Sequence, residues 1–151
     1  MRKPVSDLAD HLGYWLRYVS NHVSRAFAAK VAKKGVTVAE WVVLRSLYDA
    51  EPMSPSRLAA ELGMTKGAIT KLADRLIEKS LVLRRASPSD GRAQSLTLTA
   101  QGAKLAPELA ALADQNDAEY FGSLSAADRR SLLRLLQHLV KDAEMKSIPT
   151  T

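Results

Sequence analysis

The sequence has no cysteine among its 151 residues. Disulfide bonds, thiolate catalysis, cysteine-based zinc sites and thiol redox sensing are therefore excluded. No apolar run approaches the roughly 20 residues that a membrane-spanning helix needs. The segment from Met1 to Ser20 also lacks the continuous apolar stretch of a secretory signal peptide. We therefore expect a cytoplasmic location.

Histidine is scarce, and glycine-rich loops are missing. The three histidines, His11, His22 and His138, form no cluster with carboxylates at metal-ligand spacing, so no metal site is expected. No nucleophile–base pair and no phosphate-binding glycine loop is apparent. These absences argue against an enzyme, the first alternative considered, and we expect no cofactor.

The sequence is basic, with a net charge of +6, and otherwise has the composition of an ordinary globular protein, with 46% apolar and 25% charged residues. Residues 1–36 contain seven basic and two acidic side chains, residues 51–99 eight and five, and residues 100–151 six and seven. A basic excess favours nucleic acid or an anionic membrane surface as the partner. Such a partner is expected to meet the first two regions.

Apolar residues spaced by three and four predict helices, and a change to alternation predicts a hairpin. Capping residues and turn residues set the boundaries. The expected helices are Ser6–Lys33, Thr37–Tyr48, Ser54–Gly63, Lys66–Lys79, a long helix capped by Thr99 and ending near Phe121, and a last helix from Ser125 to about Val140. The expected strands are Leu81–Ala86 and Gln94–Thr99, joined by a turn at Ser87–Gly91.

Two short helices that meet at Gly63 have the spacing of a helix-turn-helix. This motif needs a small residue where the helices cross, a residue that can leave helical geometry at the turn, and an apolar anchor in the second helix. Ala59, Gly63 and Ile69 supply these in order. The second helix is then expected to enter the major groove of DNA with its N-terminal part.

The outward face of this second helix has side chains suited to DNA. Lysine and arginine pair with phosphates or guanine edges, and threonine hydroxyls reach phosphate or base. The helix N-terminus itself favours an anion. The alternative is a solvated amphipathic helix, for which a charged outer face is normal. The candidate DNA contacts are Thr65, Lys66, Thr70, Lys71 and Arg75.

The hairpin tip is the second candidate contact. Arg84, Arg85 and Arg92 bracket a turn that contains Asp90 and Gly91. An arginine at such a tip is suited to the adjacent minor groove, where the negative potential is strong. Asp90 is expected to position Arg92 by an ion pair. The alternative is a solvated turn with incidental arginines.

The segment from Asp90 to Gly102, with the sequence DGRAQSLTLTAQG, resembles the wing signature of the MarR family (multiple antibiotic resistance regulators). The order of elements resembles this family over nearly the whole chain. The resemblance implies a mainly α fold with a small β-hairpin wing: a winged helix-turn-helix with long N- and C-terminal dimerisation helices. The implied division is residues 1–36 for the first dimerisation helix, 37–99 for the DNA-binding domain and 100–151 for the last dimerisation helices.

The family resemblance also implies a homodimer on a pseudo-palindromic, double-stranded DNA operator, with repression as the commoner mode. The apolar stripes of the terminal helices suit such an interface, although packing within one chain remains the alternative. The recognition-helix contacts fall on the residues named above, and the wing contact falls on Arg92. Gly91 occupies a position that is often basic in the family, so Arg84 or Arg85 could compensate.

Many members of this family release DNA when a small anionic aromatic compound binds. Aromatic side chains suit a ring, and arginine or histidine suits a carboxylate. The alternative is that these side chains belong to the core, the surface or an interface. The candidate lining residues are Tyr14, Arg17, Tyr18, His22, Trp41 and Arg45.

The resulting hypothesis is a sequence-specific transcriptional regulator, most simply a repressor. A non-specific architectural or protein-interaction module with the same fold is the second alternative, because a fold does not fix a function.

Overall fold

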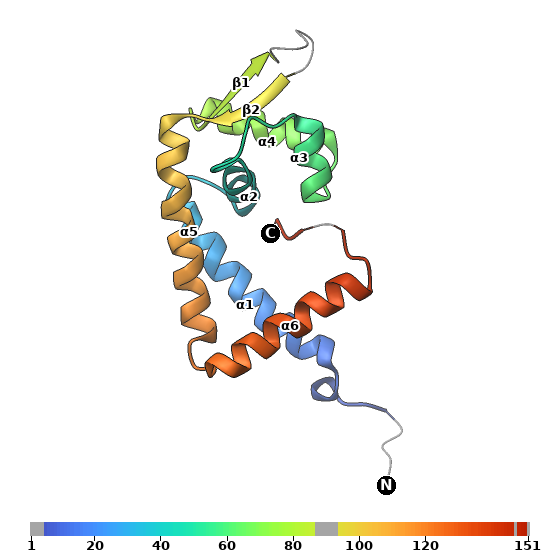
Figure 1. Ribbon diagram of the computed structural model, residues 1–151. Helices are drawn as coiled ribbons and strands as arrows, with labels where there is room; N and C mark the ends of the chain where they lie inside the picture. The colour runs from blue at the N-terminus through green and yellow to red at the C-terminus, as the bar shows by residue number, and fades with distance from the viewer. Residues whose placement is uncertain (1–4, 87–93, 147, 151) are drawn as a thin grey trace.

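The computed structural model describes residues 5–86, 94–146 and 148–150 (Figure 1). Within them the chain forms one 3-10 helix, six α-helices and a two-stranded antiparallel hairpin. The mainly α fold with a β-hairpin, expected from the sequence, is confirmed. The elements are η1 (Leu8–Asp10), α1 (Leu12–Ala32), α2 (Val38–Leu47), α3 (Pro55–Leu62), α4 (Lys66–Glu78), β1 (Val82–Ala86), β2 (Gln94–Leu98), α5 (Ala100–Phe121) and α6 (Ala126–Asp142).

The first helix starts later than the sequence pattern predicts. Instead of beginning at Ser6, α1 begins at Leu12, after the short helix η1 and an extended His11. The carboxylate of Asp10 accepts a hydrogen bond from the Asp7 amide at 2.9 Å, which closes η1 as a separate turn. The indole of Trp15 donates to the carbonyl of Ala9 at 2.9 Å and holds this turn against α1.

The predicted N-terminal caps of the five later helices are all present. In each case a hydroxyl accepts a hydrogen bond from the backbone amide three residues further on, which satisfies one of the unpaired amides of the first turn. The capping residues are Thr37 for α2, Ser54 for α3, Thr65 for α4, Thr99 for α5 and Ser125 for α6. Because these caps are local signals, the starts of these five helices could be predicted from the sequence.

One apolar core joins α2, α3, α4 and the hairpin at one end of the molecule. Leu44, Leu58, Ile69, Leu76 and Leu96 are fully buried in it. Figure 1 shows α5 running from this end to the opposite end, where α6 begins, and α1 packs along α5. The hairpin gains a further pairing partner because Met53 and Leu96 exchange two backbone hydrogen bonds of 3.1 and 2.8 Å.

Thr99 joins the hairpin to α4 and α5. Its hydroxyl donates to the Ser80 carbonyl at 2.7 Å and accepts from the Gly102 amide at 3.0 Å. Its own amide donates to the Leu81 carbonyl at 3.1 Å. Gly102 is buried against Leu81, the residue before β1, and a β-carbon at Gly102 would overlap the Leu81 carbonyl oxygen. The start of α5 and the start of β1 therefore approach at backbone contact distance.

The last helix lies outside the core. None of the described residues of α6 is buried, and this helix lies apart from α2, α3 and α4 in Figure 1. The N-terminal half of α1, from Leu12 to Ser20, is exposed in the same way. None of the helices in the described ranges is long and apolar enough to cross a membrane.

The close approach at Gly102 predicts a large effect of one added methyl group. Gly102→Ala is expected to lower the free energy of unfolding by about 3 kcal/mol, because overpacking against rigid backbone cannot relax by a rotamer change. Chemical denaturation checks this value. Gly13→Ala is the matched control, since nothing lies within 4 Å of the position that its added methyl group would take in α1. A Gly102→Ala protein as stable as the Gly13→Ala protein would contradict the proposed contact.

Candidate nucleic-acid interface

Helix α4 has two distinct faces. Its inner face is formed by Ile69, Leu72, Ala73 and Leu76, which are all buried in the core. A helix repeats every 3.6 residues, so the positions between these residues must point outward. The buried inner face therefore determines which side chains α4 presents to solvent.

The five residues predicted as recognition-helix contacts all lie on the exposed side of α4 or at its cap. They are Thr65, Lys66, Thr70, Lys71 and Arg75. Two of the hydroxyls already serve the helix itself. Thr65 accepts from the Ala68 amide at 3.1 Å, and Thr70 donates to the Lys66 carbonyl at 2.9 Å. In this arrangement Thr65 retains a hydroxyl proton to donate, whereas Thr70 retains only acceptor capacity.

The turn before α4 has the geometry that the helix-turn-helix spacing predicted. Gly63 adopts left-handed backbone geometry with φ of 62°, and its amide donates to the carbonyls of Ala59 and Ala60. A residue with a side chain is strained at such a φ, which accounts for glycine here. Ala59 is buried at the crossing of α3 and α4.

The two arginines of β1 have different environments. Arg84 pairs with Asp74 on α4, with the guanidinium 2.7 Å from the carboxylate, and it lies opposite the buried Leu96 in the hairpin register. Arg85 lies opposite Ser95 and, by strand alternation, on the other face of the hairpin. Both arginines are exposed, but Arg84 connects the hairpin to α4 through its ion pair with Asp74. Asp90, Gly91 and Arg92 lie outside the described residues.

The C-terminal end of α4 is attached to the start of α2. The Lys79 ammonium donates to both carboxylate oxygens of Glu40, at 2.9 and 2.8 Å, and to the Gly35 carbonyl at 2.8 Å. Glu40 is 1% exposed and also accepts from the Thr37 amide at 2.9 Å. Burial alone would raise the pKa of Glu40, but the bonds from Lys79 and Thr37 and the charge of Lys79 outweigh it and lower this pKa.

A crevice of about 280 Å³ lies between α1, α2 and α5. Its lining includes Trp41, whose ring packs edge-on against Phe27 with centroids 6.4 Å apart. Asn116, which is 2% exposed, donates to the Val23 carbonyl at 3.1 Å and accepts from Lys30 at 2.8 Å. The lining residues are Val23, Ser24, Phe27, Val38, Trp41, Val42, Ala113, Asn116, Asp117 and Pro149.

The predicted ligand-lining residues fall into two groups. Trp41 and Arg45 share a shallow depression of about 390 Å³, where the Arg45 guanidinium lies 5.8 Å from the centroid of the Tyr48 ring. Tyr14, Tyr18 and His22 instead form a row on exposed α1, with Tyr18 and His22 stacked at 5.3 Å.

Arg17 is also exposed on this half of α1. The α1 wall of the crevice is formed by Val23, Ser24 and Phe27. Of the six predicted lining residues, Trp41 is the one that lines this crevice within the described part of one chain.

Several contacts at this end of the molecule were missed from the sequence. Asp74 lies within the basic face of α4, but its pairing with Arg84 depends on the hairpin register. Glu40 and Lys79 are 39 positions apart, and the local pattern around Glu40, a capping box with Thr37, does not point to Lys79. The contact of Phe27 with Trp41 depends on the packing of α1 on α2, which no local pattern specifies.

The comparisons with known proteins agree with this geometry. The sequence profile of the MarR family matches residues 36–93. The HTH-type transcriptional repressor Rv2887 of Mycobacterium tuberculosis is 33% identical over 131 residues, which is 87% of this chain and 94% of the relative.

Solved structures of two such proteins have the same fold. The Rv2887 complex with p-aminosalicylic acid aligns with a TM-score of 0.66 and 32% identity, over 85% of this chain and 98% of that one. CouR from Rhodococcus jostii RHA1 bound to p-coumaroyl-CoA aligns with a TM-score of 0.75 and 28% identity, over 89% and 95%. The chain belongs to the MarR family of transcriptional regulators, which are DNA-binding proteins rather than enzymes.

Proposed function

We propose that this protein is a transcriptional repressor that binds a pseudo-palindromic operator as a homodimer and releases it when a small aromatic or anionic ligand binds. The observation that carries the proposal is the outer face of α4: Lys66, Lys71 and Arg75 project from it into solvent, while the opposite face of the helix is buried. A regulator that acts on chromosomal DNA in a bacterium works in the cytoplasm, which we propose as its location.

The proposed DNA contacts are the exposed residues of α4 and the wing. Thr65, Lys66, Thr70, Lys71 and Arg75 would face the major groove, and Arg92, positioned by Asp90, would enter the minor groove. Arg85, exposed on β1, would add a phosphate contact. Arg84 serves α4 through Asp74, so we propose it as a support for the wing, with a direct DNA contact as its lesser role.

An apolar groove between α1, α5 and α6 supports the proposed dimer. A hollow of about 710 Å³ is lined by Leu12, Trp15, Leu16 and Val19 of α1 together with residues of α5 and α6. Of these lining residues, Leu12 is 89% exposed and Leu139 of α6 is 51% exposed. Apolar surface of this kind marks an interaction site in a folded protein.

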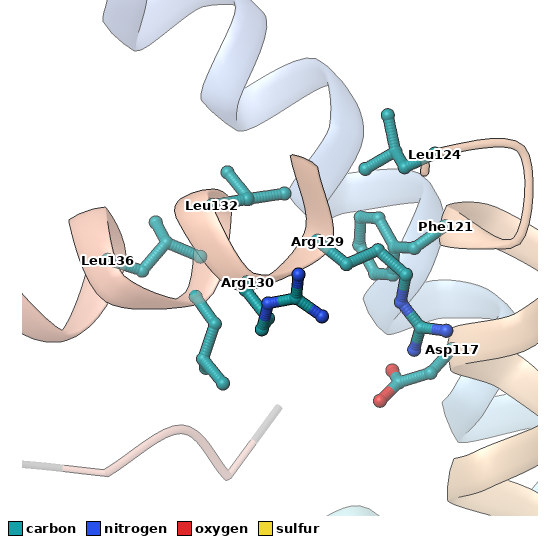
Figure 2. Close-up of a pocket in the computed structure, with 8 residues that line it drawn as sticks. Asp117, Phe121, Leu124, Arg129, Arg130, Leu132 and Leu136 are labelled. Carbon is teal, nitrogen blue, oxygen red and sulfur yellow. The ribbon is translucent and has the colours of Figure 1, made fainter. Parts of the chain in front are cut away.

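The groove continues around the junction of α5 and α6. Figure 2 shows Phe121 and Leu124 at this junction and Leu132 and Leu136 further along α6, with Arg129 and Asp117 pointing toward one another. Phe121, Leu124, Leu132 and Leu136 line both hollows, so the two form one surface. The occupant we propose is the same surface of a second copy, because a twofold dimer joins identical patches.

The distribution of buried and exposed apolar residues along the chain supports three functional regions. We propose residues 1–36 and 100–151 as the dimerisation parts and residues 37–99 as the DNA-binding domain. The family profile falls almost wholly within the middle part. The buried core also lies mostly there, while most of the exposed large apolar residues lie on the flanking helices.

The ligand would enter the crevice that contains Trp41 and Phe27. Two relatives were solved with p-aminosalicylic acid and with p-coumaroyl-CoA, and both ligands contain an aromatic ring and an anionic group. The crevice lies between α2, which belongs to the DNA-binding domain, and α1 and α5. Tyr14, Arg17, Tyr18, His22 and Arg45 are proposed to complete the site in the dimer.

The first experiment tests sequence-specific DNA binding. Genomic DNA fragments that the protein retains are sequenced, and the selected site is compared with a scrambled one at two salt concentrations. We expect the operator to bind at least about a thousandfold more tightly than scrambled DNA, as specific regulators do. Equal affinities would favour a non-specific architectural protein and contradict the proposal.

Two substitutions test the outer face of α4. Lys71→Ala and Arg75→Ala are each expected to weaken operator binding by about 1–3 kcal/mol where the side chain reads a base. A phosphate contact would instead lower the salt slope by about one. Arg134→Ala, on the polar side of α6, removes the same charge and should leave binding unchanged. Variants of α4 that bind like the Arg134→Ala control would refute this face as the interface.

One substitution tests the dimer. Leu136→Asp is expected to raise the dimer dissociation constant by on the order of 100-fold, because a buried unpaired carboxylate is costly. Leu136 is 38% exposed in the single chain, so the fold should survive. Analytical ultracentrifugation measures the equilibrium, and circular dichroism checks the helices. Arg134→Asp is the control on the opposite side of α6. An unchanged dimer in the Leu136→Asp protein would remove this groove from the interface.

Tryptophan fluorescence tests the ligand crevice. Trp15 and Trp41 are the two tryptophans, and only Trp41 lines the crevice. p-Aminosalicylate should quench emission in the Trp15→Phe protein and weaken its operator binding, whereas the Trp41→Phe protein should show little quenching. Quenching that persists without Trp41 but disappears without Trp15 would place the ligand on α1 instead.

A further inference from the structure

Lys79 follows the last residue of α4, at the opposite end from Lys66 and one turn beyond Arg75, the nearest proposed DNA contact. The helix has 13 residues and is therefore about 20 Å long from end to end. The three hydrogen bonds of the Lys79 ammonium go to Gly35 and Glu40. They use the full donor capacity of an ammonium group, and none is left for a phosphate.

The ion pair connects two helix ends of opposite polarity. Glu40 lies in the first turn of α2, where the helix dipole favours an anion, and Lys79 follows the last turn of α4, where it favours a cation. Glu40 is buried, so it depends on this cation more than a surface carboxylate would. The pair therefore fixes the direction of α4 relative to α2.

The third bond extends this connection to α1. Gly35 belongs to the turn between α1 and α2 and adopts φ of 82°. Lys30, in the last turn of α1, bonds Asn116 and Glu119 of α5 at 2.8 Å each. The turn that Lys79 holds is thus itself anchored to the long helices of the proposed dimer.

From this geometry we propose that Lys79 is a positioning residue for operator recognition. Through Glu40 and Gly35 it fixes the angle of α4 relative to α1 and α2, and hence the separation of the two α4 helices in the dimer. The inference rests on the proposed DNA-binding function. It goes further by assigning the reading of half-site spacing to an ion pair outside the DNA interface. A dimer whose reading helices are held rigidly discriminates between half-site spacings, because the two helices must meet the groove one helical turn apart.

The test compares Lys79→Met, Glu40→Gln and the double variant with the unaltered protein. Each is measured on the selected operator, on operators with one base pair inserted or deleted between the half-sites, and on scrambled DNA. Lys33→Met, in the turn after α1, is the matched control because it removes the same charge from an exposed position. All titrations are run well below the melting temperature of each variant.

We expect Lys79→Met to weaken binding to the correct operator on the order of tenfold, within the range of coupled contacts, with an unchanged salt slope. Its preference for the correct spacing should shrink by a similar factor. Glu40→Gln, which keeps the shape of the side chain, should show the same loss of spacing preference. The double variant should be no worse than Lys79→Met, since it no longer buries an unpaired carboxylate.

Three results would overturn the inference. A salt slope lowered by about one in Lys79→Met would make Lys79 a phosphate contact. A lower melting temperature with unchanged spacing preference would make the pair purely structural. If Lys33→Met weakened operator binding as much as Lys79→Met does, the loss would be due to the change in net charge. If the unaltered protein itself fails to prefer the operator over scrambled DNA, the proposed function fails, independently of Lys79.

Discussion

The burial of one face of α4 is the constraint on which the rest of the structure depends. Ile69, Leu72 and Leu76 are packed into the core, and the helical repeat then leaves Lys66, Lys71 and Arg75 in solvent. Removing fully buried aliphatic side chains of this size costs about 2–5 kcal/mol each, so rotation of the helix about its axis is strongly opposed. A cationic surface of fixed composition follows from apolar packing alone.

Polar contacts then determine where α4 points. Asp74 binds Arg84 of the hairpin midway along the helix, and Lys79 binds Glu40 and Gly35 beyond its last turn. Thr99 bonds the Ser80 carbonyl just after α4 and caps α5 with the same hydroxyl. Helix α4 is therefore connected to the hairpin, to the α1–α2 turn and to α5. Movement of the long helices would therefore be transmitted to α4 through these contacts.

Local sequence chemistry predicted most of the fold. Hydroxyl caps at Thr37, Ser54, Thr65, Thr99 and Ser125 are short-range signals, and each begins a helix in the structure. The start of α1 was wrong because Leu8 and Leu12 have helical spacing, and the pattern cannot register that Asp10 closes a separate turn before an extended His11.

The exposed residues of the candidate interface were readable for the same short-range reason, since they follow from the 3.6-residue repeat of one helix. The partners of Arg84 and Lys79 were not, because they come from elements that meet only in three dimensions. The predicted ligand residues were the least accessible to sequence reasoning. Trp41 lines the crevice between α1, α2 and α5, while Tyr14, Tyr18 and His22 form a row on exposed α1.

Hydroxyl-radical footprinting of the operator complex tests the central claim, that paired copies of α4 read adjacent turns of DNA. The account predicts two protected regions related by twofold symmetry, with centres about 10 base pairs apart on one side of the duplex. A single protected region, or uniform protection along the fragment, would contradict it.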